Sequence, residues 1–315
     1  MDQSETKSIL IDCDPGIDDA IALMVAFAWR DRLDIKGITC AAGNQTVLKT
    51  FHNALRIARH LNVEVPVACG AEKPLIKPLA VAEKANGKTG LEGMNITEDM
   101  IRPNKMSAFD LISKILEGSE KKITIIATAP LTNIAQVLSV RPQLKTKIDH
   151  ISLMGGSSLA GNMTPVSEFN MFVDPEAAKI VLGSGVPITM FGLDVTYKAY
   201  TTRQDIQHIA ILENRASRML EDLLHYYMGY SEKMGLDGVA IHDACTVIYE
   251  LKPELFSGIQ RVSVDIDTGG GQCYGCTLVD LHHLTGRPEN VDFVTQVDRT
   301  AFNDFIFDSC SHYRN

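Results

Sequence analysis

The chain has 315 residues, of which 45% are hydrophobic and 22% charged, a composition typical of a globular protein with a large apolar core. Its net charge of −9 and isoelectric point near 5.5 argue against a nucleic-acid partner, because binding to a phosphate backbone depends on clustered Lys and Arg. The longest apolar run, Ala20 to Trp29, is about half of the roughly 20 residues that a membrane-spanning helix needs. We therefore expect no membrane span, and a small uncharged or cationic ligand.

The N-terminal segment and the cysteines both suggest a cytoplasmic protein. The first seven residues lack the basic and then apolar layout of a secretory signal. The seven cysteines are odd in number and scattered, which suits a reducing compartment better than a disulfide framework. Cys273 and Cys276 form a C-x-x-C, but no second pair accompanies it, so we do not expect a metal or redox site there.

Strand-like and helix-like segments alternate from the N-terminus onward. The pattern predicts strands at Ser8–Asp12, Asp34–Thr39, Ile123–Thr128, His150–Met154 and Pro187–Phe191, and helices at Asp18–Trp29, Val47–Leu61, Leu131–Val140 and Pro175–Leu182. This βαβ rhythm indicates an α/β fold, with a mostly parallel open sheet and helices on both faces. In such a fold, ligands bind at the carboxyl ends of the strands.

The residue pattern of the second half of the chain predicts extra helices and C-terminal strands. Residues 202–249 have a helical pattern, and the expected strands at 259–265, 277–281 and 291–297 precede a helix at 299–310. No linker or repeat interrupts the chain, so we expect a single domain over residues 1–315. The stretch Glu83 to Glu92 is rich in Gly and Lys and has little apolar periodicity, which favours a mobile loop that could cover a site.

Four carboxylates, those of Asp12, Asp14, Asp18 and Asp19, follow the first strand within eight residues. Strand alternation places Asp12 and Asp14 on the same side, Pro-Gly forces a turn, and Asp18 and Asp19 open the next helix near its positive end. Carboxylates held so close must protonate or share a cation. Several hard oxygen ligands suit Ca²⁺ or Mg²⁺ better than Zn²⁺.

Two other interpretations of this motif stay open at this point. Asp18 could simply cap a helix while the other three are solvated turn residues, as most loop aspartates are. An Asp-x-Asp after the first strand is also typical of haloacid-dehalogenase-type phosphatases, so a metal-dependent phosphohydrolase is the alternative chemistry. That class would use a later Gly-Asp pair, which the chain does not show at the required spacing.

Further motifs follow the opening run Asp-Cys-Asp-Pro-Gly-Ile-Asp-Asp in a fixed order. They are Ala-Gly-Asn-Gln-Thr at 42–46, Pro-Leu-Thr-Asn-Ile-Ala at 130–135, Leu-Met-Gly-Gly at 153–156, Gly-Asn-Met-Thr-Pro-Val-Ser-Glu-Phe-Asn at 161–170, Asp-Pro-Glu-Ala-Ala at 174–178, Gly-Leu-Asp-Val-Thr at 192–196 and His-Asp at 242–243. Each string alone is weak, but the ordered set resembles the nucleoside hydrolase family, the inosine-uridine-preferring and ribonucleoside hydrolases, over almost the whole chain.

The resemblance implies a Rossmann-like nucleoside hydrolase fold and Ca²⁺-dependent hydrolysis of the N-glycosidic bond of ribonucleosides to ribose and free base. By the resemblance, Ca²⁺ is held by the carboxylates of Asp14, Asp19 and Asp243 and by the main-chain oxygen of Thr128. Asp14 also takes a proton from the attacking water, and Asp12 orients the metal ligands. Relatives are usually dimers or tetramers, so we expect a homodimer or homotetramer.

The resemblance also assigns the sugar-binding residues. Asp18 corresponds to the ligand of the ribose hydroxyls, with Asn44 beside it. Asn162, Glu168 and Asn170 correspond to the family's grip on the 5′- and 3′-hydroxyls. Amide and carboxylate groups suit this task because each hydroxyl needs both a donor and an acceptor.

The base side is less determined. His242 is the leading candidate for the acid that protonates the leaving base, although it could instead only pack beside the metal. Tyr227 and Tyr230 could line the base pocket or be ordinary core or surface aromatics. Many relatives carry His-Gly-Glu-Thr-Gly where this chain has Asn-Gly-Lys-Thr-Gly from Asn86, which cannot donate a proton in the same way but could bind a base edge. The purine or pyrimidine preference therefore stays open.

A non-catalytic nucleoside-binding protein on the same scaffold is the second alternative. Asp14, Asp19, Asp243 and His242 are all present, which argues against lost catalysis.

Overall fold

The computed structural model describes residues 6–94 and 106–314. Residues 1–5 lie outside the described residues. They are part of the segment on which the expectation of no secretory signal depends.

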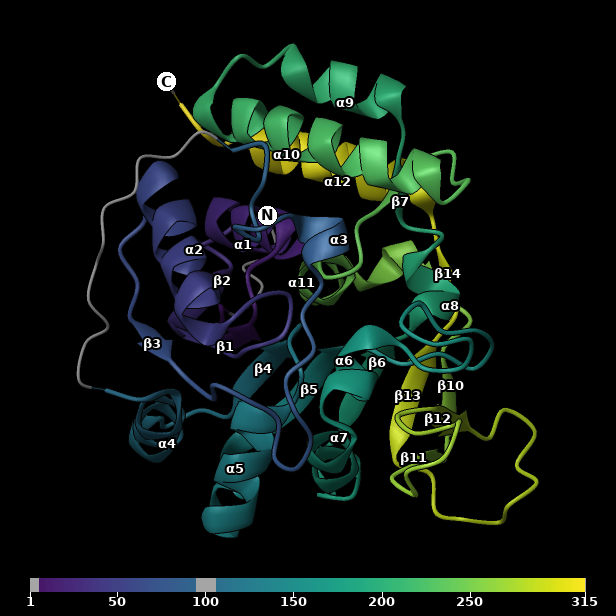
Figure 1. Ribbon diagram of the computed structural model, residues 1–315. Helices are drawn as coiled ribbons and strands as arrows, with labels where there is room; N and C mark the ends of the chain where they lie inside the picture. Colours follow the sequence, from purple (N-terminus) through teal and green to yellow (C-terminus); the bar gives the residue numbers. More distant parts are fainter. Residues whose placement is uncertain (1–5, 95–105, 315) are drawn as a thin grey trace.

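An eight-stranded sheet forms the centre of the molecule (Figure 1), in the order β10-β13-β6-β5-β4-β1-β2-β3. Its strands are β1 Lys7–Cys13, β2 Leu33–Cys40, β3 Val67–Cys69, β4 Ile123–Ala127, β5 Ile148–Met154, β6 Ile188–Phe191, β10 Gln260–Val262 and β13 Val291–Val294. Seven run parallel and only β10 is antiparallel to its neighbour, which confirms the predicted mostly parallel sheet.

Helices cover both faces of this sheet, as predicted (Figure 1). One face packs against α1 Ile17–Ala28, α2 Val47–His60, α10 Arg215–Lys233, α11 Ala244–Leu251 and α12 Arg299–Ser311, and the other against α4 Ala108–Gly118, α5 Thr132–Val140 and α7 Pro175–Leu182. Strand alternation divides the two cores within β1, because Ile9 and Ile11 belong to the first and Leu10 to the second. None of the described helices is long and apolar enough to cross a membrane.

Short elements complete the fold at the edges and the strand ends. They are the helices α3 Glu83–Asn86, α6 Phe169–Val173, α8 Leu193–Thr196 and α9 Arg203–Ala210, the 3₁₀ turns η1 Pro142–Lys147 and η2 Pro253–Leu255, and three two-stranded sheets formed by β7 Tyr200–Thr201 with β8 Val239–Ala240, β9 Phe256–Ser257 with β14 Gln296–Val297, and β11 Val264–Ile266 with β12 Thr277–Val279.

Several predicted boundaries were wrong for identifiable reasons. The expected strands 259–265 and 291–297 are each divided, because their first halves pair in the main sheet and their second halves in separate two-stranded sheets. The helical stretch 202–249 is interrupted by β8, which leads into α11. Strand β3 and helix α4 were missed, although Ser107 gives α4 a capping signal by accepting a hydrogen bond from Asp110 N at 3.1 Å.

The segment expected to be a mobile loop, residues 83–92, is docked in this structure. Side chains of α2 and of the turn before it bind its main-chain oxygens: Lys49 Nζ donates to Lys88 O at 2.6 Å, Gln45 Nε2 to Gly87 O at 3.0 Å, and Asn53 Nδ2 to Thr89 O at 2.9 Å. The loop therefore forms part of the wall beside the carboxyl ends of β1 and β2.

A partly buried ion-pair network joins three distant segments near the amino ends of the strands. Glu250 accepts from Lys7 Nζ at 3.0 Å and contacts His150 Nε2 at 2.8 Å. Burial alone lowers the pKa of His150, but the hydrogen bonds and charges of Glu250 and then Asp149 together outweigh it and raise that pKa. Burial alone raises the pKa of Glu250, yet its hydrogen bond with His150 and the charges of His150 and Lys7 hold that pKa below its usual range.

We expect this network to make stability depend on pH. Because the folded pKa of His150 is raised, its stabilising effect is complete below the unfolded value of about 6.5 and is lost as the pH rises through the folded value. The effect of Glu250 is present above about pH 4.3 and is lost as the pH falls. The free energy of unfolding in urea should therefore decline from pH 6 to pH 8.5 in the wild type and less so in His150→Gln. A matching flattening in the exposed-site control His225→Gln would contradict this origin.

Candidate active site

The register of the sheet fixes Asp12 between two neighbouring strands. Asp12 lies opposite Thr39 of β2 and Ala127 of β4. Its Oδ1 accepts from Thr39 Oγ1 at 2.5 Å and from Asn133 Nδ2 at 2.8 Å. Its Oδ2 is buried without a hydrogen-bond partner among the described residues. Two neutral donors thus fix Oδ1 of Asp12, while Oδ2 has no donor to offset its negative charge at the strand end.

Asp14 and Asp19 are linked through Asn44. The main-chain N–H of Asn44 donates to Asp14 Oδ2 at 2.6 Å, and its side-chain Nδ2 donates to Asp19 Oδ2 at 3.2 Å. Asp19 Oδ2 also accepts from Gly16 N, and Asp19 Oδ1 accepts from Thr128 Oγ1 at 2.8 Å. In the part of the chain that the structure describes, Asp14 Oδ1 has no hydrogen-bond partner although it is buried.

Asp243 joins the cluster from the helical half of the chain, at the start of α11. One carboxylate oxygen from each of Asp18, Asp19 and Asp243 lies within 4.8 Å of the others, close enough for these residues to share a metal ion. The ligand set implied by the resemblance has Asp14 in place of Asp18. The structure thus brings together every predicted carboxylate, with Asp14 tied to Asp19 through Asn44 rather than inside this closest group.

The electrostatics of the cluster favour a cation. Burial, followed by the charges of neighbouring aspartates, raises the pKa of Asp14 and Asp243 well above the usual range, and that of Asp18 to about 7. Burial raises the pKa of Asp12 to about 6 and also raises that of Asp19. No Lys or Arg pairs with these groups among the residues described, so a bound divalent cation fits both the charge and the oxygen donors. The interpretation as solvated turn residues was wrong, because none of the five is more than 8% exposed.

The predicted sugar-binding residues lie on the segment that enters α6. Glu168 is buried and caps this helix, accepting from the main-chain N–H groups of Asn170 and Met171, and also from that of Gly156. Asn170 Nδ2 donates to the main-chain oxygen of Thr128 at 2.8 Å, which places Asn170 directly beside an expected metal ligand. Asn162 is exposed, and its Oδ1 accepts from the N–H of Phe169. The structure therefore joins Asn170 to the cluster and leaves Asn162 on the rim.

His242 lies in a group of polar and aromatic side chains beside Asp243. Its Nδ1 is 2.7 Å from Thr196 Oγ1, and its ring contacts the edge of Tyr197 at a centroid distance of 5.3 Å. Burial lowers the pKa of His242 to about 4, so the ring is neutral at pH 7 in this structure. Burial, and after it the charges of Asp18 and Asp243, raises the pKa of Tyr227 well above its usual range. Tyr230 stacks on Tyr227 with centroids 6.0 Å apart.

Asn86 is held by protein contacts at both ends of its side-chain amide. It is 3% exposed, its Oδ1 accepts from Ile17 N at 3.0 Å, and its Nδ2 donates to Asn44 Oδ1 at 2.9 Å. Both ends of the amide therefore bind protein, and the contact with a base edge stays a prediction.

Sequence reasoning did not assign roles to three residues that contact the site. Asn133 and Thr39 hold Asp12, and Thr196 binds His242. Asn133 and Thr196 stand within motifs quoted above, so their positions carried a signal, whereas Thr39 required knowledge of the strand register.

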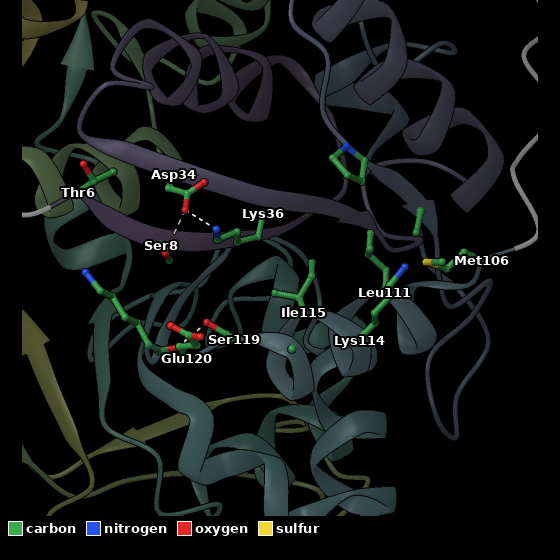
Figure 2. A pocket seen from close by; sticks show the side chains of 14 residues that line it. Thr6, Ser8, Asp34, Lys36, Met106, Leu111, Lys114, Ile115, Ser119 and Glu120 are labelled. Atoms are coloured by element: carbon green, nitrogen blue, oxygen red, sulfur yellow. Dashed lines mark hydrogen bonds and ion pairs between the residues drawn. The ribbon is translucent and has the colours of Figure 1, made fainter.

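A separate hollow of about 800 Å³ lies toward the amino ends of β1 and β2, beside α4 (Figure 2). Ser8, Asp34 and Lys36 line it and contact one another there, with Ser8 Oγ donating to Asp34 Oδ2 at 3.2 Å. The hollow shares no residue with the carboxylate cluster, which lies at the opposite strand ends. We therefore place the active site at the cluster and not in this hollow.

Gly43 offers a test of the cluster, because a Cβ added there would lie 2.1 Å from Asp14 Oδ2. We expect Gly43→Ala to displace Asp14 and to weaken Ca²⁺ binding about 10-fold or more, measured by calorimetry, while far-UV circular dichroism stays native. Gly118→Ala is the control, since its Cβ would meet nothing within 4 Å. Unchanged Ca²⁺ affinity in folded Gly43→Ala would exclude Asp14 from the site.

Comparison with known proteins shows the family of this chain. A family model described as inosine-uridine preferring nucleoside hydrolase matches residues 9–304. The chain is 44% identical over 308 residues to the pyrimidine-specific ribonucleoside hydrolase RihA of Escherichia coli O1:K1, covering 97% of this chain and 98% of that protein. It is also 44% identical over 311 residues to RihA of Photobacterium profundum, covering 98% and 100%.

Solved structures show the same fold. A purine-preferring ribonucleoside hydrolase from Gardnerella vaginalis superposes with a TM-score of 0.89 at 29% identity, covering 97% of this chain and 98% of its own. A plant nucleoside hydrolase, PpNRh1, superposes with a TM-score of 0.90 at 27% identity, covering 98% and 99%. Sequence motifs, fold and carboxylate cluster agree, and the chain belongs to the inosine-uridine preferring nucleoside hydrolase family, as an enzyme that hydrolyses N-glycosyl bonds.

Proposed function

We propose that this protein is a Ca²⁺-dependent hydrolase that converts pyrimidine ribonucleosides, uridine and cytidine above all, to ribose and the free base. The observation that carries the cation dependence is the buried carboxylate cluster, which has no positive partner among the described residues. The pyrimidine preference is supported by the full-length relatives at 44% identity, which are named pyrimidine-specific. The purine-preferring structure is less similar, at 29% identity.

Asp14, Asp19, Asp243 and the main-chain oxygen of Thr128 would hold the cation, with Asp18 close enough to share it. Ca²⁺ accepts six to eight oxygen ligands in flexible arrangements, which suits a set drawn from several chain segments. When bound, the ion would neutralise the carboxylates, ligate ribose hydroxyls and make a nearby water more acidic.

Asp14 is suited to accept a proton from the attacking water. The Asn44 N–H fixes Oδ2 at 2.6 Å, which orients the carboxylate and leaves Oδ1 available. A general base must have such a free oxygen within hydrogen-bond reach of the water. Asp14 therefore combines a fixed position with one free oxygen.

The ribose would lie between Asp18 and the segment that carries Glu168 and Asn170. Cleavage of an N-glycosidic bond builds positive charge on the sugar ring, and preorganised carboxylates stabilise that charge. Glu168 and Asn170 are held by main-chain groups before substrate arrives, so little reorganisation is needed on binding. Asn162 would reach the sugar from the rim.

His242 is oriented for the leaving base by Thr196. The Thr196 hydroxyl is buried, and within the described part of the chain it makes one hydrogen bond, to Nδ1 of His242. A buried hydroxyl that accepted from Nδ1 would leave its own proton unsatisfied, so we infer that it donates to Nδ1. The neutral ring then carries its hydrogen on Nε2, and this N–H can donate a hydrogen bond that stabilises negative charge on the departing base.

Neither alternative from the sequence is retained. The family match over residues 9–304 argues against an Asp-x-Asp phosphohydrolase. The complete set of carboxylates and His242 argues against a binding protein without activity. We also propose a homodimer or homotetramer, by analogy with the family.

Purified protein should release ribose from uridine and cytidine without added phosphate, with kcat/KM about 10-fold or more above that for inosine. Chelation with EGTA should stop release and excess Ca²⁺ should restore it, because the carboxylate cluster loses its neutralising charge. A reducing-sugar assay across purine, pyrimidine and deoxyribonucleosides measures both effects. Release that requires phosphate would indicate a phosphorylase, and activity in EGTA would contradict the metal dependence.

His242→Ala should lower kcat for uridine by about 10²–10³, because the departing base loses the Nε2–H donor that offsets its developing negative charge. The loss for p-nitrophenyl riboside should be less than about 10-fold, since its leaving group departs without a proton. Steady-state kinetics on both substrates provide the comparison. Equal losses on the two substrates would assign His242 a packing role only.

A further inference from the structure

The loop of residues 83–92 reaches the carboxylate cluster through one side chain. Asn86 ends α3, is 3% exposed, and accepts the N–H of Ile17, the first residue of α1. Its Nδ2 donates to Asn44 Oδ1 at 2.9 Å. Asn86 therefore ties the loop both to the helix that carries Asp18 and Asp19 and to Asn44.

Asn44 in turn contacts the carboxylate cluster. With its Oδ1 held by Asn86, its Nδ2 points toward the carboxylates and donates to Asp19 Oδ2 at 3.2 Å and to Asp14 O at 3.3 Å. An Asn44 amide turned by half a rotation would present its oxygen to these acceptors and repel them. The donor from Asn86 is the contact that selects the productive orientation.

Close packing restricts both amides. A Cβ added at Gly16 would lie 2.7 Å from Asn86 Oδ1 and 2.8 Å from Asn44 Nδ2, so the two side chains fill the space beside this turn. Groups packed this tightly change position together rather than independently.

We propose that Asn86 is a positioning residue of the cation site, which sets the orientation of Asn44 and through it the placement of Asp14 and Asp19. This inference rests on the proposed function for the existence of that cation site. It also links the loop to the site: the docked loop raises cation affinity, and by thermodynamic reciprocity the cation stabilises the docked loop.

The first experiment is a double-mutant cycle on the full chain stripped of metal. Calorimetry with Ca²⁺ should show dissociation constants about 10- to 100-fold weaker for Asn86→Ala and for Asn44→Ala, the usual range for residues that orient metal ligands. The double variant should be no weaker than Asn44→Ala, because the effect of Asn86 passes through Asn44. Additive losses would overturn the inference.

Lys49→Met is the matched control. It removes a loop contact, the donation to Lys88 O, without touching Asn44. Its Ca²⁺ dissociation constant should stay within about threefold of wild type. A loss as large as that of Asn86→Ala would assign the effect to loop docking in general. Asn86→Ser replaces Asn86→Ala if thermal unfolding shows that the latter does not fold.

The second experiment needs no activity. Ca²⁺ should slow amide hydrogen exchange about 10-fold in the peptide 83–92 of the wild type, and this effect should disappear in Asn86→Ala. Slowing confined to residues 12–19 would overturn the role of Asn86 while the cation site stands. Absence of Ca²⁺ binding in the wild type would overturn both the metal dependence and this inference.

Discussion

Five buried carboxyl groups at one end of the sheet form the constraint on which the rest of the structure depends. Burial raises the pKa of all five groups, and neighbouring aspartates add to the rise in most of them: Asp12, Asp14, Asp18, Asp19 and Asp243. No Lys or Arg in the described part of the chain neutralises their negative charge. Such a cluster costs free energy unless the groups protonate or a cation joins them. The protein therefore keeps an arrangement that is unfavourable by itself, as expected for a site that binds a cation.

Neutral amides and hydroxyls carry the positioning. Asn44, Asn133 and Asn170 each bind a main-chain or carboxylate oxygen of the site, and Thr39 and Thr128 donate hydroxyl hydrogen bonds to Asp12 and Asp19. A Lys or Arg in these places would neutralise the carboxylates and compete with a metal ion. Neutral donors fix geometry while leaving the negative charge for the ion. The hydrogen bond from Asn86 to Asn44 is another neutral contact of this kind, and it connects the neighbouring loop to the site.

Much of the fold and the centre of the site were predictable because their signals are local. The strand-helix alternation of the first half, the crowded aspartates after β1 and the ordered motifs are all properties of short segments. The division of the expected strands 259–265 and 291–297 was not predictable, because each half pairs with a different partner. Strand β3 has only three residues and is recognisable mainly by its place beside β2.

By itself, the sequence determined the fold class, the family and the chemical kind of the site, since these depend on residue types in a fixed order. Only the tertiary structure decided how the members meet: Asp243 joins Asp18 and Asp19, Thr196 orients His242, and Asn86 binds Asn44. The loop expected to be mobile is docked, through Lys49 and Asn53 of α2 and through Gln45 before it. These contacts join residues tens to hundreds of positions apart, and no local pattern encodes which distant groups the packing of sheet and helices brings within a hydrogen bond.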